Sequence, residues 1–412
     1  MPLTWCFPGN YLTLEVLLNV IGGDIVSEEA TRYEASHIQV LEGWEAVRKR
    51  PGMYVGSTGE RGLRHMVFEI AARAVNEVLA GRAACVDITL TPDGGVCVAD
   101  DGPGVPVDGT EGAGGPGLEA LLTRMQAGTG TGGRHDVTPG FHGVGPGVVN
   151  ALSRRMTAEV RREGVRWVRE YARGVAATPL TKVGTATGSG TTVAFWPDAD
   201  IFGATEFSFG ELEERFRELA FLNQSLEISL TDLRRPDESR SVRLRFPGGT
   251  RDFVDFLDSC TTASAPMDTI AFEREDPRMR GVMEVAFRWC GCPEERMRSF
   301  ANSRPTYDGT HAVGFRDGMA AAVTAYAREQ GLLRPTDPDF GTDRIGAGLT
   351  AVVSVKLDRP EFEGSTRGVL GNSEVRECVG QAVQDHLGRW LKEDPERAAA
   401  VIDQLVQGPR RD

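Results

Sequence analysis

Glycine is concentrated in one segment of this chain, between Gly102 and Gly147. Loops longer than about 12–15 residues are uncommon in compact domains, and those that occur are usually lids or binding loops. The segment ends in "GFHGVGPGVVNAL" at 140–152, where Pro146 suits a first helical turn and the apolar run after it predicts a helix. A glycine loop that leads into a helix N-terminus exposes backbone N–H groups to an anion. We therefore expect a domain that binds a phosphate group at this loop.

Composition limits the class of protein. The chain has 412 residues, 40% hydrophobic and 25% charged, which is typical of a soluble globular protein of two or three domains. Its net charge of -13 argues against a surface that coats nucleic acid, although a local basic patch is compatible with it. The seven cysteines lack the paired spacing of a zinc finger and indicate reduced thiols in the cytoplasm. The sequence contains no membrane-spanning apolar run.

The pattern of apolar residues predicts two regions of mixed structure. From Ile38 to about Trp196 strands alternate with helices, including a helix over 62–80 and a hairpin that turns at Glu163-Gly164. A second region begins near Phe207 and contains further strands. Its two long helices are predicted over 314–331 and 373–394.

Two short patterns carry candidate chemistry. Asp100, Gly102 and Gly104 follow a predicted strand as D-x-G-x-G, so a carboxylate there could accept a hydrogen bond from an amino group beside a closely approaching backbone. Glu69 and Arg73 are four residues apart on the predicted helix and therefore neighbours on one face. They are either a catalytic carboxylate with an unusual neighbour or an ordinary ion pair. The glycine loop lacks the G-K-[ST] of a Walker A loop and the preceding strand of a Rossmann fingerprint.

In this order the motifs resemble the GHKL nucleotide-binding superfamily, and more specifically the B subunits of bacterial type IIA DNA topoisomerases, DNA gyrase above all. The likeness spans roughly residues 33–400. It is carried by "VLEGWEAVRKRPGMYVGSTGERGLRHMVFEI", "FHGVGPGVVNAL", "FWPDADIF", "RELAFLN", "DGTHAVGFRDGM" and "GLTAVVSVKLDRPEFEGSTRGVLGNSEVR". It implies an α+β fold: a Bergerat-type GHKL ATPase α/β sandwich, followed by a transducer domain of the ribosomal-protein-S5-like type.

The resemblance also implies domain limits. Residues 1–32 would be an extension of unknown role, 33–206 the ATPase domain with an N-terminal arm, and 207–412 the transducer. The family's metal-binding cleavage (TOPRIM) domain is expected to be absent from this chain, because nothing in it matches that domain's acidic signatures.

Carried over by position, the resemblance assigns a role to each candidate site residue. Glu69 would be the general base for the attacking water, and Asp100, helped by Thr191, would hold the adenine amino group. Arg162 would lie at the rim of the pocket, and Tyr33 would reach the partner subunit's nucleotide. The nucleotide-binding set implied is Tyr33, Asp100, Gly102, Gly104, Gly140, His142, Gly143, Val144, Gly145, Arg162, Thr191 and Arg367.

Several positions depart from the family pattern. Arg73 replaces the asparagine that holds Mg²⁺ in the family, and a guanidinium has no lone pair with which to bind a metal. The family implies that the chain binds ATP with Mg²⁺, but position 73 therefore offers no ligand for the metal. Arg73 could supply positive charge to the phosphates directly, or pair with Glu69 and lower its basicity. Arg367 stands where the family has a phosphate-touching lysine, and Pro103 where it has an arginine beside adenine.

The expected function is an ATP-binding module that forms a homodimer on ATP and couples ATP binding and hydrolysis to passage of a DNA duplex. Its expected partners are a topoisomerase A-type subunit or a full-length B-type subunit. Binding to a membrane is not expected. The alternative is a hydrolysis-deficient nucleotide switch that modulates a full-length topoisomerase through mixed dimers. His311 in "GTHAVGF" is expected to be a structural residue and not a ligand.

Overall fold

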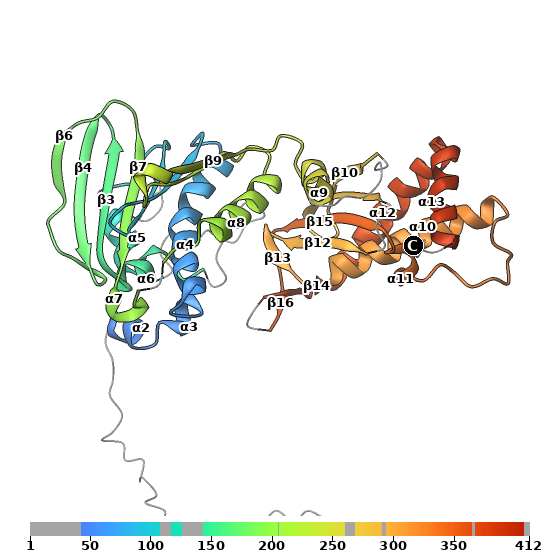
Figure 1. Cartoon of the computed structure of the whole chain (residues 1–412), viewed down its shortest axis with the longest axis horizontal. Helices are drawn as coiled ribbons and strands as arrows, with labels where there is room; N and C mark the ends of the chain where they lie inside the picture. Colours follow the sequence, from blue (N-terminus) through green and yellow to red (C-terminus); the bar gives the residue numbers. More distant parts are fainter. Residues whose placement is uncertain are drawn as a thin grey trace, which may run out of the picture. The chain divides into compact units, whose positions relative to one another are not determined.

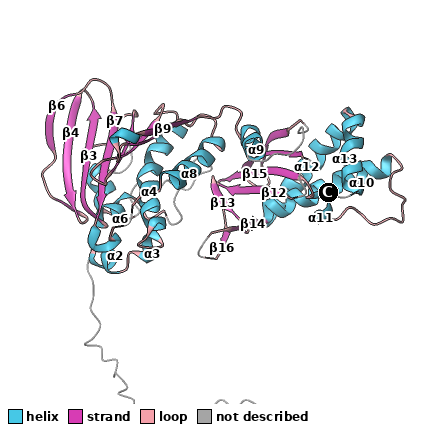
Figure 2. Ribbon diagram, in the orientation of Figure 1, coloured by secondary structure: helices cyan, strands magenta, loops and turns pink. Residues whose placement is uncertain are grey.

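The computed structural model describes residues 43–107, 117–125, 143–204, 206–259, 268–290, 294–364 and 367–407. These residues form a mixed α+β protein whose strands belong to two large sheets and a small third one (Figures 1 and 2). The α+β class expected from the sequence is therefore confirmed. No helix within the described ranges is long and apolar enough to cross a membrane.

The first sheet has the strand order β5-β4-β3-β7-β2-β1-β8-β9, with β6 paired to β4. Its neighbours are antiparallel except for β1 and β8, which are parallel. The strands are β1 (Val86–Leu90), β2 (Val96–Asp100), β3 (Ser153–Arg162), β4 (Val165–Ala172), β5 (Val175–Ala176), β6 (Thr181–Thr185), β7 (Gly190–Pro197), β8 (Ile228–Asp232) and β9 (Arg240–Leu244).

Helices cover one face of this sheet (Figure 1). The long helix α4 is buried along most of its length against β1, β2 and β7, which positions any polar side chain on its inner face beside the strand ends. The helices of this part are α2 (Glu45–Lys49), α3 (Gly52–Val55), α4 (Glu60–Leu79), α5 (Leu118–Thr123), α6 (Pro146–Ala151), α7 (Ala199–Phe202) and α8 (Phe209–Phe221), with a short 3-10 turn at Pro236–Glu238.

Local sequence explains two features of this sheet. Glu163 and Gly164 form the predicted turn between β3 and β4, and both have positive φ, 54° and 73°, as a two-residue hairpin turn requires. Strand β8 pairs with β1, and β9 pairs with β8, so the first sheet continues to Leu244. The boundary between domains at 206/207 stays a prediction.

The second sheet has the order β10-β11-β15-β12-β13, and β14, β17 and β16 form the small sheet. In β15 the side chains of Ala351, Val353 and Val355 enter one core, while Val352 enters a second core on the opposite face. Burial on both faces explains its continuous apolar sequence. The elements are α9 (Thr250–Ser259), β10 (Ile270–Asp276), β11 (Gly281–Trp289), β12 (Arg296–Ala301), β13 (Arg304–Thr306), β14 (Asp308–Gly309), α10 (Thr310–Glu329), α11 (Thr342–Ile345), β15 (Leu349–Leu357), β16 (Phe362–Glu363), β17 (Val369–Leu370), α12 (Ser373–Glu393) and α13 (Pro395–Gln407).

Candidate functional site

Glu69 lies on the buried face of α4, with 3% of its surface exposed. Its Oε2 accepts a hydrogen bond of 2.9 Å from the backbone N–H of Gly145, the residue before α6. Its Oε1 lies 3.2 Å from Nε2 of His65, one helical turn earlier. Gly145 has φ 84°, a conformation that favours glycine and turns this N–H toward the helix. The carboxylate is thus held at the end of the glycine loop.

Arg73 lies one turn after Glu69, and its guanidinium contacts the sheet. Its Nη1 donates to Oδ2 of Asp100 at 2.6 Å, and its Nη2 donates to Oγ1 of Thr191 at 2.9 Å. Asp100 and Thr191 are directly opposite each other in the β2–β7 register, so one side chain reaches both. The sequence predicts that Arg73 either serves the phosphates or pairs with Glu69. Its two hydrogen bonds to the sheet correspond to neither alternative.

Asp100 is buried at the end of β2, and both of its carboxylate oxygens accept a hydrogen bond. Its Oδ1 accepts from the N–H of Gly102 at 3.0 Å, while its Oδ2 accepts from Arg73. Burial raises the pKa of the Asp100 carboxyl, and the Arg73 guanidinium and the Gly102 N–H oppose this rise only in part. A Cβ at Gly102 would lie 2.9 Å from Oδ1, so glycine permits this close approach.

Residues of strands β3 and β7 fix the rest of the D-x-G-x-G segment. Gly104 has φ 77°, and a Cβ there would lie 2.7 Å from the carbonyl oxygen of Arg161. Nη1 of Arg162 donates to the Gly104 carbonyl oxygen at 2.8 Å, and Oγ1 of Thr191 accepts from the Val105 N–H at 3.0 Å. Arg162 and Thr191 therefore hold this segment against the sheet.

Only some of the remaining predicted residues lie within the described ranges. Gly143, with φ 58°, and Val144 directly precede Gly145, while Gly140, His142 and Tyr33 lie outside the described residues. Arg367 is exposed and has φ 52°. The predicted residues brought together are thus Glu69 with Gly145, Asp100 with Thr191, and Gly104 with Arg162.

Arg304 interacts electrostatically with Glu69. Burial, together with the charges of Arg367 and Arg215, lowers the pKa of Arg304 to about 10, and the carboxylate of Glu69 opposes this shift. Arg304 begins β13 and is 6% exposed. The second sheet therefore brings positive charge within electrostatic reach of the carboxylate on α4.

Comparison with known proteins agrees with this arrangement. The family "Histidine kinase-, DNA gyrase B-, and HSP90-like ATPase" matches residues 58–201, and the family "DNA gyrase B" matches residues 249–411. The DNA gyrase B protein of Streptomyces coelicolor is 44% identical over 397 residues, which cover 92% of this chain and 58% of the relative.

Solved structures extend the likeness to three dimensions. The 43K ATPase domain of Thermus thermophilus gyrase B, solved with an aminocoumarin, has a TM-score of 0.73 and 34% identity, covering 89% of this chain and 94% of that one. The chain belongs to the DNA gyrase B family. The topoisomerase IV ATP-binding domain of Francisella tularensis has a TM-score of 0.70 and 30% identity, covering 89% of this chain and 97% of that one.

Membership of the gyrase B family confirms the fold expected from the motifs: a GHKL ATPase sandwich followed by an S5-like transducer. The chain spans 58% of the length of the Streptomyces relative.

The described residues do not provide the metal site that the gyrase B family implies. Mg²⁺ prefers oxygen ligands, yet Asp100 is engaged by Arg73, and of the Glu69 oxygens Oε2 accepts from Gly145 and only Oε1 accepts no hydrogen bond from a described residue. Arg73 presents donors only. Within the described ranges, no cluster of three His, Cys, Asp or Glu side chains could hold a metal ion. No step of the proposed reaction is therefore assigned to a metal on the protein.

Two residues of this gyrase B-like site were missed from the sequence. His65 is four residues before Glu69, and that helical spacing was sufficient to find it. Arg304 is far from Glu69 in sequence, and no local pattern signals that the two charges interact.

Proposed function

We propose that this chain is a nucleotide-binding module of a type IIA DNA topoisomerase, which binds ATP, dimerises on it and couples its hydrolysis to DNA passage. The observation that supports this most directly is the 2.9 Å hydrogen bond between Glu69 and the N–H of Gly145. It holds a carboxylate beside a glycine loop, where a nucleotide's terminal phosphate would meet a base. The gyrase B likeness across both regions supports the wider role.

In this proposal Glu69 is the general base. It accepts a proton from a water molecule as the water oxygen attacks the terminal phosphorus, and the bond to the leaving diphosphate oxygen breaks. His65 is assigned as a positioning residue, because its Nε2 lies 3.2 Å from Oε1 of Glu69. Arg367 provides positive charge to the terminal phosphate. The base subsite comprises Asp100 and Thr191.

The remaining proposed contacts are assigned by position in the family. Gly102 and Gly104 allow the backbone to approach the nucleotide, and Arg162 lies at the rim. The phosphate loop comprises Gly140, His142, Gly143, Val144 and Gly145, and Tyr33 reaches the nucleotide of the partner protomer. When bound with its nucleotide, Mg²⁺ would neutralise phosphate charge.

We propose a homodimer as the ATP-bound state, working with a topoisomerase A-type or full-length B-type subunit and a DNA duplex. The alternative of a hydrolysis-deficient switch rested on departures from the family pattern, among them Arg73 in place of the metal-binding asparagine and Pro103 in place of the adenine-side arginine. The likeness to the ATPase domains of gyrase B and topoisomerase IV does not favour this alternative.

The test is steady-state hydrolysis of ATP by the purified chain across protein concentration, beside the variant Glu69→Ala. Turnover per chain should rise with concentration, because the dimer is the active form. Glu69→Ala should lower turnover by about 10²–10⁴-fold, the usual contribution of a general base. Glu60→Ala, an exposed glutamate in the first turn of α4, is the matched control and should behave as wild type.

Sedimentation with a non-hydrolysable ATP analogue separates binding from chemistry. Dimerisation by both the wild-type chain and Glu69→Ala would support the proposal. A chain that remains monomeric with saturating analogue, or turnover that persists in Glu69→Ala, would contradict it.

A further inference from the structure

Arg73 donates hydrogen bonds to both residues of the base subsite of the proposed function. Its side chain keeps 14% exposure, whereas the side chain of Asp100 keeps 2% and Thr191 is 2% exposed. The acid and the hydroxyl are thus more deeply buried than the guanidinium that donates to both of them. A nucleobase that binds to these two groups must therefore compete with the arginine already bound to them.

The side-chain oxygens of these two residues already accept hydrogen bonds. Asp100 accepts from the Gly102 N–H through Oδ1 and from Arg73 through Oδ2. Oγ1 of Thr191 accepts from the Val105 N–H and from Arg73. A guanidinium has five N–H donors and no acceptor, and two of its donors are used here. The subsite as built thus offers donors to a base.

The N7 edges of the two purines differ in the hydrogen-bonding groups that they present. Adenine presents an amino donor beside the N7 acceptor, while guanine presents two adjacent acceptors, O6 and N7. Arginine binds that pair of acceptors with its forked donors. Adenine's amino group would oppose the guanidinium, and reaching Asp100 would require Arg73 to leave the ion pair that it forms with this buried carboxylate.

We propose that Arg73 is the specificity-determining residue of this site and turns its preference from adenine toward a purine nucleotide that carries oxygen at position 6. This inference rests on the proposed function, because it assumes that Asp100 and Thr191 form the base subsite. ATP is still a ligand, but GTP and inosine triphosphate bind more tightly. The inosine nucleotide shares O6 and N7 with guanine and lacks its 2-amino group.

The experiment measures dissociation constants of the imido analogues of ATP, GTP and inosine triphosphate for the full chain by calorimetry. The wild-type chain should bind the GTP and inosine analogues at least about tenfold more tightly than the ATP analogue, the discrimination expected of one good bidentate pair. Arg73→Asn removes the fork, exposes Asp100, and should reverse the ratio. Arg61→Asn, the same substitution at an exposed position of α4, should leave the ratio unchanged.

Other outcomes would contradict either this inference or the proposed function. Tighter binding of ATP by both the wild-type chain and Arg73→Asn would overturn the inference and leave the proposed function standing. A wild-type chain that binds no analogue while Arg73→Asn binds ATP would show that Arg73 blocks the subsite, which also overturns the inference. Failure of both proteins to bind any analogue, with folding confirmed by circular dichroism, would overturn the proposed function itself.

Discussion

His311 shows how one buried side chain acquires a structural role. It lies in the first turn of α10 with no exposed surface, and its Nε2 is 3.0 Å from Oγ1 of Thr306. That hydroxyl is in turn 2.8 Å from Oγ of Ser299. Burial lowers the pKa of His311 to about 4, and the charge of Asp308 opposes this only in part. The histidine is therefore neutral in the fold, which agrees with its expected structural role.

The neutral state of His311 predicts an acid-sensitive fold. Its pKa is about 4 in the folded state and about 6.5 unfolded, so between these values the unfolded chain binds a proton that the folded chain does not. The free energy of unfolding should therefore fall as pH falls from 6.5 toward 4, by about 2 kcal/mol at pH 4.5 from this residue. Urea unfolding at pH 7 and pH 4.5 measures it.

The comparison protein for this pH effect is His311→Gln, which keeps an amide near the position of Nε2 and does not titrate. Its own stability at pH 7 is immaterial, because the readout is the change between the two pH values. That change should be smaller than in wild type by about 2 kcal/mol. Equal changes in the two proteins would exclude His311 as the source.

At the scale of elements, α10 and α12 approach so closely that glycine is required at the crossing. A Cβ at Gly314 would lie 2.3 Å from the carbonyl oxygen of Arg376, and one at Gly318 would lie 2.4 Å from that of Gly380. Backbone atoms cannot rotate away as a side chain can. The distance between these helices is therefore set by the absence of side chains.

Gly314→Ala should separate the two helices and lower the free energy of unfolding by about 1–3 kcal/mol, the usual cost of overpacking. Gly388→Ala on α12 is the matched control, because a Cβ there meets nothing within 4 Å. It should instead stabilise the protein by up to about 1 kcal/mol through helix propensity. Denaturant unfolding of the three proteins provides the comparison, and a stabilised Gly314→Ala would contradict the close approach.

Periodicity predicted these helices well and predicted their neighbours poorly. The expected ranges 314–331 and 373–394 compare with Thr310–Glu329 and Ser373–Glu393, because the 3.6-residue repeat is a local signal. By contrast, the parallel pairing of Val86 with Ile228 joins strands far apart in sequence, and no local pattern reports it.

The same limit applies to the candidate site. The spacing of Glu69 and Arg73 fixed their common helix face, but the choice of Arg73 between Glu69 and Asp100 depended on where β2 ends relative to α4. That relation is tertiary, and only the folded chain provides it. Gly145 was accessible from sequence, because the glycine loop and the helix after it are local features.

For the molecule as a whole, the contacts between α8 and the second sheet connect the two regions. Nη2 of Arg215 donates to the carbonyl oxygen of Ser303 at 2.8 Å, and Nδ2 of Asn223 donates to Oγ of Ser303 at 3.2 Å. Burial lowers the pKa of Arg215, and its ion pair with Glu218 opposes this. A largely buried cation and a buried amide therefore both depend on the same turn between β12 and β13.

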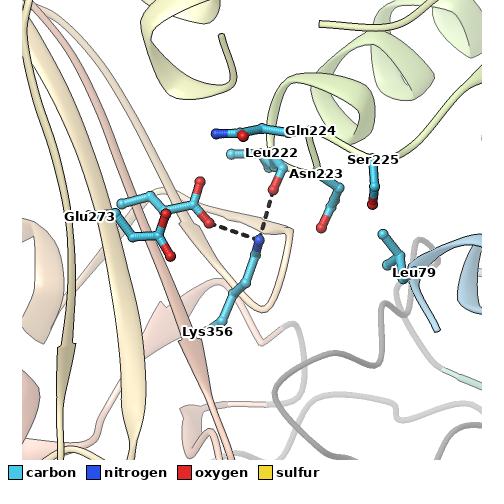
Figure 3. Close-up of a pocket in the computed structure, with 8 residues that line it drawn as sticks. Leu79, Leu222, Asn223, Gln224, Ser225, Glu273 and Lys356 are labelled. Carbon is cyan, nitrogen blue, oxygen red and sulfur yellow. Dashed lines mark hydrogen bonds and ion pairs between the residues drawn. The ribbon is translucent and has the colours of Figure 1, made fainter. Parts of the chain in front are cut away.

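A cavity of about 280 Å³ lies beside these contacts, and Lys356 of β15 crosses it (Figure 3). Its Nζ donates to the carbonyl oxygen of Leu222, just after α8, at 2.9 Å and to Oε1 of Glu284 at 2.8 Å. The lysine thus ties the end of α8 to two strands of the second sheet. The cavity is lined by Leu79, Leu222, Asn223, Gln224, Ser225, Glu273, Glu284 and Lys356.

Lys356→Met should uncouple the two regions. The side chains of Lys356 and Glu284 are 17% and 12% exposed, so removal of the ammonium leaves a carboxylate with little water to replace it. The loss should be about 3 kcal/mol, whereas Lys392→Met, which breaks a pair that is 59% and 54% exposed, should cost less than about 1 kcal/mol. Calorimetric unfolding should show the two regions melting in separate steps in Lys356→Met only.

Adding Glu284→Met to Lys356→Met should recover most of the stability, because the unpaired carboxylate is then gone. Equal losses in the two lysine variants, or no recovery in the double variant, would show that this buried pair does not couple the regions.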